Sequence, residues 1–115
     1  YYAKILKEEY KFPAGIPLRE RKEIRSPKKI HVAKLQVTNA AKVPYDKAKA
    51  SIVFDLSNGG KRFILAEKFR TIKLKWINDR LVFIDCNIGH VASVGQVYDV
   101  EEDRWIYQKG ESYYY

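Results

Sequence analysis

The stretch that decides the fold reads TIKLKWINDRLVFIDC and occupies residues 71–86. In its first part, apolar Ile72, Leu74 and Trp76 alternate strictly with polar residues. Alternation with a period of two is typical of a β-strand that buries one face and exposes the other to solvent. The segment therefore predicts a half-buried strand, with lysines on its solvent face.

The second part of this stretch predicts the next strand of the same sheet. Asn78 and Asp79 provide turn chemistry. Residues 81–86 are then apolar on both faces except at Asp85, which favours a central position in the sheet. Further strands are expected over 91–100 and 105–108. In pattern, residues 71–107 resemble one blade of a β-propeller, which implies strands that run up and down in chain order.

Upstream of this stretch, the sequence continues to predict strands, over residues 30–38, 51–56 and 62–65. In the first of them the apolar phase changes between Val32 and Leu35, which indicates a β-bulge. Asn58-Gly59-Gly60 supplies the positive φ angles that a hairpin turn requires. The fold class expected is mainly β: a small antiparallel meander, as a sandwich or partly open barrel. The side chains expected in its core are Ile72, Leu74, Trp76, Phe83, Ile84 and Trp105.

The first 29 residues differ from the rest. We expect residues 1–29 to form a basic N-terminal extension and residues 30–115 to form the antiparallel β domain. Pro17 suits the first position of a short helix that would end before Pro27, and a flexible arm is the alternative. Six basic residues lie in the second part of this extension: Arg19, Arg21, Lys22, Arg25, Lys28 and Lys29.

Composition limits the classes of protein that the chain can belong to. It has 115 residues, 46% of them hydrophobic, which suits one globular domain. A formal net charge of +8 attracts acidic proteins, nucleic acid, acidic glycans or anionic envelope components. No apolar run has the length of a membrane span. The chain begins at Tyr1 and contains no Met, so we expect a periplasmic or secreted protein, with the cytoplasm as the alternative.

Residues that could carry catalysis or bind a metal do not form a recognisable motif. Asp85 and Cys86 are neighbours on a strand, so they point to opposite faces and cannot act together, even with His90 nearby. Cys86 is expected to be buried and inert. His31 and His90 lack a fixed ligand spacing, and Asn58 to Lys61 lacks the full phosphate-binding pattern. We therefore expect no catalytic residue, no metal and no cofactor.

The function expected is that of a non-enzymatic binding module, similar in size to inhibitors and immunity proteins. Its partner would be a protein or an envelope component, and an anionic polymer or a small enzyme are the alternatives. Nucleic acid is disfavoured because Trp76 lies on the apolar side of its strand, away from the lysines. Tyr107 and the terminal tyrosines are typical of an interface. Beyond the six basic residues above, the candidate binding residues are Lys73, Lys75, Tyr113 and Tyr114.

Overall fold

A computed structural model describes residues 3–39, 41–44, 47–88 and 92–112, with the side chains of 110–112 excepted. Within these residues the regular structure is β throughout, with all neighbouring strands antiparallel. The strands are β1 (Ala3–Leu6), β2 (Leu18–Arg25), β3 (Val32–Thr38), β4 (Lys49–Asp55), β5 (Lys61–Glu67), β6 (Thr71–Trp76), β7 (Leu81–Asn87), β8 (Ala92–Asp99) and β9 (Arg104–Ser112).

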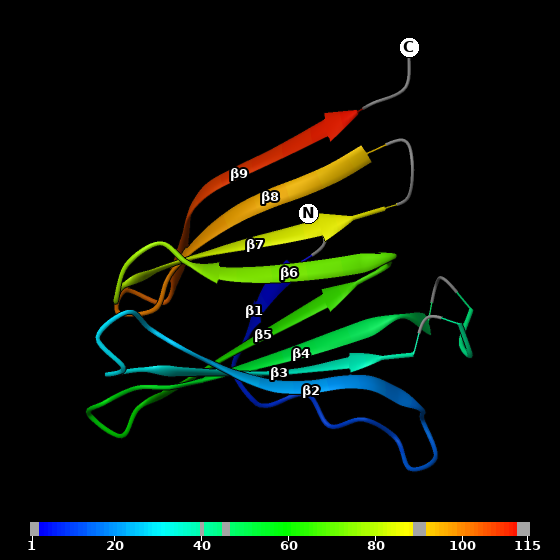
Figure 1. The fold of residues 1–115 in the computed structure, drawn as a ribbon, viewed down its shortest axis with the longest axis horizontal. Helices are drawn as coiled ribbons and strands as arrows, with labels where there is room; N and C mark the ends of the chain where they lie inside the picture. Colours follow the sequence, from blue (N-terminus) through cyan, green and yellow to red (C-terminus); the bar gives the residue numbers. More distant parts are fainter. Residues whose placement is uncertain (1–2, 40, 45–46, 89–91, 113–115) are drawn as a thin grey trace.

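The strands form two open sheets, as Figure 1 shows. Sheet A has the order β1-β5-β4-β3-β2, and sheet B has the order β6-β7-β8-β9. Chain neighbours are therefore sheet neighbours almost everywhere, and only β1 is placed out of order, beside β5. The predicted mainly antiparallel β fold is confirmed, and so are the central position of β7 and the up-and-down order of sheet B.

One hydrophobic core is shared by the two sheets. Sheet A contributes alternate residues of β3 to β5, including Leu35, Ile52 and Phe54, and sheet B contributes residues of β6 to β8. Of the six side chains predicted in the core, Ile72, Leu74, Trp76 and Ile84 are buried and Trp105 is partly buried against the core.

Trp76 joins the two sheets most directly. Its ring meets Phe54 of β4 edge-on, with the ring centroids 5.8 Å apart, and stacks near His31 at 6.3 Å. Its indole N–H donates to the carbonyl oxygen of Ile24 on β2 at 2.9 Å, so the polar atom of a buried tryptophan is satisfied. The local alternation in β6 therefore aims Trp76 at the opposite sheet.

The structure corrects the reading of the N-terminal segment. Residues 18–25 form β2, an edge strand of sheet A, and neither the short helix nor the flexible arm that the sequence suggested. Arg21 to Arg25 pair with β3 from Gln36 to Val32, which satisfies one side of the β2 backbone. With β1 also in sheet A, the first 29 residues contribute two strands to the β domain.

The connection between β1 and β2 crosses sheet A, because these two strands lie at its opposite edges. Glu9 borders a small cleft with Gln36, Ser51 and Val53 on the outer face. Ser51 is only 4% exposed although its neighbours Ala50 and Ile52 are the ones in the core. The outer face of sheet A is thus partly covered by its own chain.

Two local predictions about turns and bulges have different outcomes. Gly59 has φ of +89° and Leu56 N–H donates to the Gly60 carbonyl oxygen at 2.9 Å, which confirms the hairpin. The bulge predicted between Val32 and Leu35 is wrong, since β3 pairs with β4 in unbroken register. The phase change arises because Leu35 and Val37 face the core, whereas Val32 lies on the other face of the strand and Ile30 precedes the strand and is exposed.

No helix in the described part of the chain has the length and apolarity needed to cross a membrane.

Candidate binding surface

The basic residues predicted on the N-terminal segment belong to a charged sheet edge. On β2, Lys22 and Arg19 lie 2.9 and 3.7 Å from Glu20, and Arg25 lies 3.9 Å from Glu23. These pairs are about half exposed, so each contributes little to stability. They do reduce the positive field along β2, and a strand edge so rich in charge resists pairing with other strands.

Lys28 and Lys29 lie in the turn between β2 and β3. The Lys28 N–H donates to Asp79 Oδ1 at 2.9 Å, which ties this turn to the β6–β7 turn and holds the pKa of Asp79 below its ordinary value. Lys29 has a positive φ of 61°. Both side chains are exposed, but the backbone here serves the contact between the two sheets.

Lys73 and Lys75 are exposed on the outer face of sheet B, as predicted from the alternation in β6. Lys73 lies opposite Asp85 and Lys75 lies opposite Phe83. No carboxylate of the described residues lies within 4.0 Å of either ammonium group. On sheet A, by contrast, Lys34 lies 2.8 Å from the carboxylate of Asp55.

The register of sheet B places aromatic side chains next to these lysines. Phe83 lies opposite Val97, and Val97 lies opposite Tyr107. One row across all four strands therefore consists of Lys75, Phe83, Val97 and Tyr107 on the outer face. Tyr107 is 50% exposed and Phe83 is partly exposed. We call the surface formed by Lys73, Lys75, Phe83, Val97 and Tyr107 the platform.

The prediction that Phe83 belongs to the core is wrong, because its side chain lies on the outer face of sheet B and not between the sheets. It packs over Gly95 on the neighbouring strand. A Cβ at position 95 would lie 2.9 Å from Phe83 Cζ and 3.4 Å from both Cε atoms, so the ring would have to shift to admit it. An aromatic ring that covers a glycine in a sheet is a known way to fill the missing side chain. Gly95 therefore fixes where the ring of Phe83 lies.

Asp85 and Cys86, considered for catalysis, lie on opposite faces of β7. Cys86 is fully buried, whereas Asp85 is on the outer face. Burial, together with the nearby charge of Asp85, raises the pKa of the Cys86 thiol to about 12. The buried His31 accepts the Ser57 N–H on its Nδ1 at 3.0 Å. Within the described residues, no three His, Cys, Asp or Glu side chains group closely enough to hold a metal ion.

His90 lies outside the described residues, and so do the candidate binding residues Tyr113 and Tyr114 and their neighbour Tyr115.

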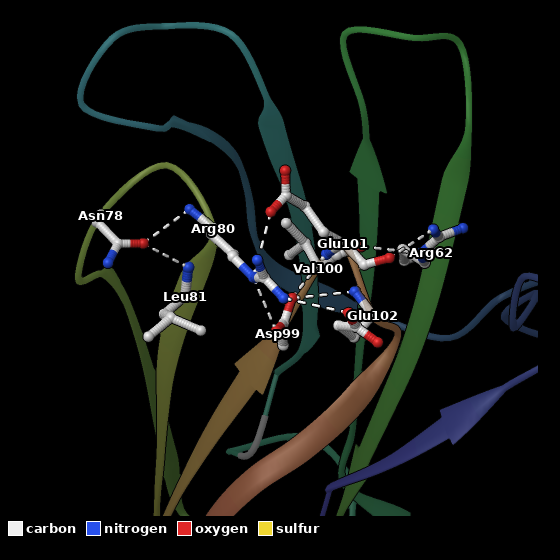
Figure 2. Close-up of polar contacts among 8 residues, drawn as sticks. All are labelled: Arg62, Asn78, Arg80, Leu81, Asp99, Val100, Glu101 and Glu102. Atoms are coloured by element: carbon white, nitrogen blue, oxygen red, sulfur yellow. Dashed lines mark hydrogen bonds and ion pairs between the residues drawn. The ribbon is translucent and has the colours of Figure 1, made fainter.

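A polar cluster at one end of sheet B is shown in Figure 2. Arg80, in the β6–β7 turn, donates from Nε to Asp99 Oδ2 at 2.9 Å and also lies near the carboxylates of Glu101 and Glu102. Asp99 Oδ1 accepts the backbone N–H groups of both glutamates, at 2.9 and 3.0 Å. Arg62 reaches across from β5 to the Val100 carbonyl oxygen at 2.9 Å. These contacts join two turns and a strand of the other sheet.

The electrostatics of this cluster indicate a structural role. Burial alone would raise the pKa of Asp99, but hydrogen bonds from Glu102 N–H, Arg80 and Glu101 N–H outweigh burial and hold the pKa below its ordinary value. The carboxylate is therefore charged and fully engaged at neutral pH. Because its oxygens already accept these donors, it is poorly suited to act as a general base.

Comparison of the chain with protein-family models, with curated protein sequences and with solved structures finds no match in any of the three. The class of the protein is defined by its fold, which is a small single all-β domain of two antiparallel sheets.

Proposed function

We propose that the chain is a non-enzymatic binding module that holds a single-stranded nucleic acid on the platform of sheet B. The observation that carries the proposal is the presence of aromatic and basic side chains on one open sheet face. Phe83 and Tyr107 offer flat surfaces on which bases stack, while Lys73 and Lys75 offer charges for the phosphates. The net charge of +8 adds a long-range attraction for a polyanion.

Two features favour a nucleic acid over a protein partner at this face. Lysine is depleted at the centres of protein–protein interfaces, whereas it is a common phosphate contact. No carboxylate of the described residues lies within 4.0 Å of either platform lysine, although Asp85 lies opposite Lys73 on the same face. The aromatic residues that a single-strand platform needs come from β7 and β9, so the position of Trp76 does not argue against it.

The rival function is the one expected from the sequence, recognition of a protein or envelope component through the basic N-terminal segment and an exposed sheet surface. The basic residues of that segment now belong to β2 and the turn after it. The exposure of Arg21, Lys22, Lys28 and Lys29 supports it. The ion pairs of β2 with its own glutamates weigh against it, because they leave less charge for a partner.

The first test is binding of a fluorescently labelled oligothymidylate, about 12 nucleotides long to suit a single small domain, measured by anisotropy at several salt concentrations. We expect the double variant Lys73→Gln/Lys75→Gln to bind more weakly. Its plot of log affinity against log salt should also be shallower by about 1.4, because each lost phosphate contact reduces the slope by about 0.7 on single strands.

The matched control is Arg21→Gln/Lys22→Gln, which removes the same formal charge from β2. If binding is located on the platform, this control keeps most of the affinity. Equal losses in both double variants would show an unlocalised charge effect and contradict the platform. A loss in the β2 control alone would favour the rival function. If the protein binds polyglutamate but not oligothymidylate, the nucleic-acid proposal is wrong and the ligand is an acidic protein surface.

A second variant tests stacking separately from charge. Tyr107→Ala leaves the net charge unchanged, so we expect an affinity loss of about 5- to 150-fold with an unchanged salt slope, the range for one lost base–aromatic stack. The control is Ile106→Ala, which removes a neighbouring exposed side chain. An unchanged affinity in Tyr107→Ala would contradict stacking on the platform.

A further inference from the structure

A concave site lies at the other sheet. It is a pocket of about 470 Å³ between the segment that precedes β2 and the loop that joins β3 to β4. This volume is within the range of small-molecule sites in proteins, about 300–1,000 Å³. None of its lining residues belongs to the platform.

The first wall of the pocket is apolar and comes from residues 10–16. Tyr10 and Phe12 are both half-buried, and their ring centroids are 5.0 Å apart. At this separation the two rings, tilted against each other, form one apolar surface. Pro13 and Ile16 complete this wall.

The second wall is formed by Val43 and Pro44 from the β3–β4 loop. Two backbone hydrogen bonds position the walls. Asn39 N–H donates to the Pro17 carbonyl oxygen at 2.8 Å, and Lys47 N–H donates to the Pro44 carbonyl oxygen at 2.8 Å. The first bond ties the two segments to each other and the second lies within the β3–β4 loop, so both walls are positioned without a ligand.

The polar side chains among the described lining residues are few: two hydroxyls, of Tyr10 and Thr38, and two ammonium groups, of Lys47 and Lys49. The Thr38 hydroxyl is already engaged, since it accepts the Lys49 N–H at 3.0 Å and lies 3.3 Å from the Lys49 carbonyl oxygen. Lys49 Nζ lies 3.3 Å from Glu67, whose carboxylate is shared with Lys4 at 3.2 Å. Lys47 is exposed and has no ion pair with any described residue. The described lining residues include two lysines and no carboxylate, so this part of the rim carries net positive charge.

From an apolar pocket of this size with a cationic rim, we infer that it binds a small amphiphilic carboxylate, such as a medium-chain fatty acid, with its chain between the two walls and its carboxylate at Lys47. A neutral ligand of the same shape would fill the pocket without meeting the rim charge, and a cationic one would be repelled. This inference does not depend on the proposed function.

The test compares three probes of equal chain length: decanoate, decan-1-ol and decyltrimethylammonium, each titrated below its micelle concentration. Binding is followed by two-dimensional amide NMR of the isotope-labelled protein. We expect decanoate to bind best and the ammonium worst, with shifts at residues 10–16 and 43–49. Absence of decanoate binding, equal binding of all three probes, or shifts confined to other parts of the chain would overturn the inference.

Two variants test where the carboxylate and the alkyl chain of decanoate bind. Lys47→Gln should weaken decanoate binding about two- to fivefold, the size of one exposed charge pair, and leave decanol binding unchanged. The matched control Lys42→Gln lies in the same loop but outside the lining, so it should bind decanoate as the parent does. Equal losses in both variants would overturn the role of Lys47.

Val43→Trp fills the pocket and should abolish binding of decanoate and decanol. If this variant does not fold, as judged by circular dichroism, the NMR shifts and the Lys47→Gln variant still test whether decanoate binds in the pocket. The double variant Lys73→Gln/Lys75→Gln should bind decanoate as the parent does. The pocket inference can therefore hold even if the platform does not bind nucleic acid.

Discussion

At the scale of single residues, the side chain of Gln96 makes the backbone hydrogen bonds that a neighbouring strand usually makes. It is fully buried on β8, and its Oε1 accepts the Ala3 N–H at 3.1 Å while its Nε2 donates to the Ala3 carbonyl oxygen at 3.0 Å. Ala3 is on the edge strand β1, so these two backbone groups would otherwise be buried without partners. One side-chain amide thus closes the edge of sheet A against sheet B.

Gln96→Leu is expected to destabilise the fold by at least about 1–3 kcal/mol, because it leaves buried backbone groups unpaired. Denaturant unfolding monitored by circular dichroism measures this. The control is Gln108→Ala, because Gln108 is exposed and accepts a single hydrogen bond from the same amide, on its Oε1 at 3.1 Å. It should cost less than about 0.5 kcal/mol. A Gln96→Leu variant as stable as the parent would show that the amide does not support β1.

Cys86 should behave as a buried, unreactive thiol. Its pKa is raised to about 12 in the fold, against about 8.5 in an unfolded chain. The proton is therefore held more tightly in the folded state, and the stabilisation that this provides is complete below about pH 8.5 and is lost as the pH rises toward 12.

The parent should therefore lose more stability between about pH 9 and pH 12 than Cys86→Ala, which lacks the titrating group and controls for lysine and tyrosine ionisation. Native protein at pH 8 should also react slowly with a thiol reagent, and unfolded protein quickly. Fast labelling of the native state would contradict burial and revive an enzymatic role.

At the scale of elements, the turns at one end of sheet B depend on Asp99. This carboxylate caps the β8–β9 turn and binds Arg80 of the β6–β7 turn. Because its pKa is lowered in the fold, its contribution is present above the unfolded value of about 3.9. That contribution is lost as the pH falls through the lower folded pKa.

Asp99→Asn should lower the free energy of unfolding by about 1.5–3 kcal/mol at pH 7, the range for hydrogen bonds to a charged group. The difference from the parent should shrink below about pH 4. Unfolding by guanidinium at several pH values measures both. Glu102→Gln, on an exposed neighbour, is the control and should change little. A difference that stays constant down to pH 2 would contradict the charge-based account.

At the scale of the whole molecule, the two sheets behave as one body. The radius of gyration is 13.9 Å, close to the value of about 13 Å for a compact domain of this length. One core unites both sheets, with Trp76 between them. Neither sheet can keep its buried face without the other.

We therefore expect a single cooperative unfolding transition. Tryptophan fluorescence, which reports on Trp76 and Trp105, and far-ultraviolet circular dichroism, which reports on all strands, should give the same midpoint within error. Two separated midpoints would show that the sheets unfold independently, which a shared core forbids.

By itself, the sequence determined the strands with clear local patterns. Strict alternation in residues 71–76 predicts which side chains are buried, because a strand turns successive residues to opposite faces whatever its neighbours are. The same holds for the Asn58 hairpin, where the need for positive φ is a property of the backbone alone. The solvent position of Lys73 and Lys75 followed directly.

Only the tertiary structure decided the identity of β2 and the composition of both candidate sites. Residues 18–25 are strongly charged and form a strand because β3 pairs with them, which no local pattern reveals. Phe83 looked like core because β7 is apolar on both faces, and only register with Lys75, Gly95 and Val97 places it outward. Strand register and the approach of distant segments depend on contacts between residues far apart in sequence, which local periodicity does not contain.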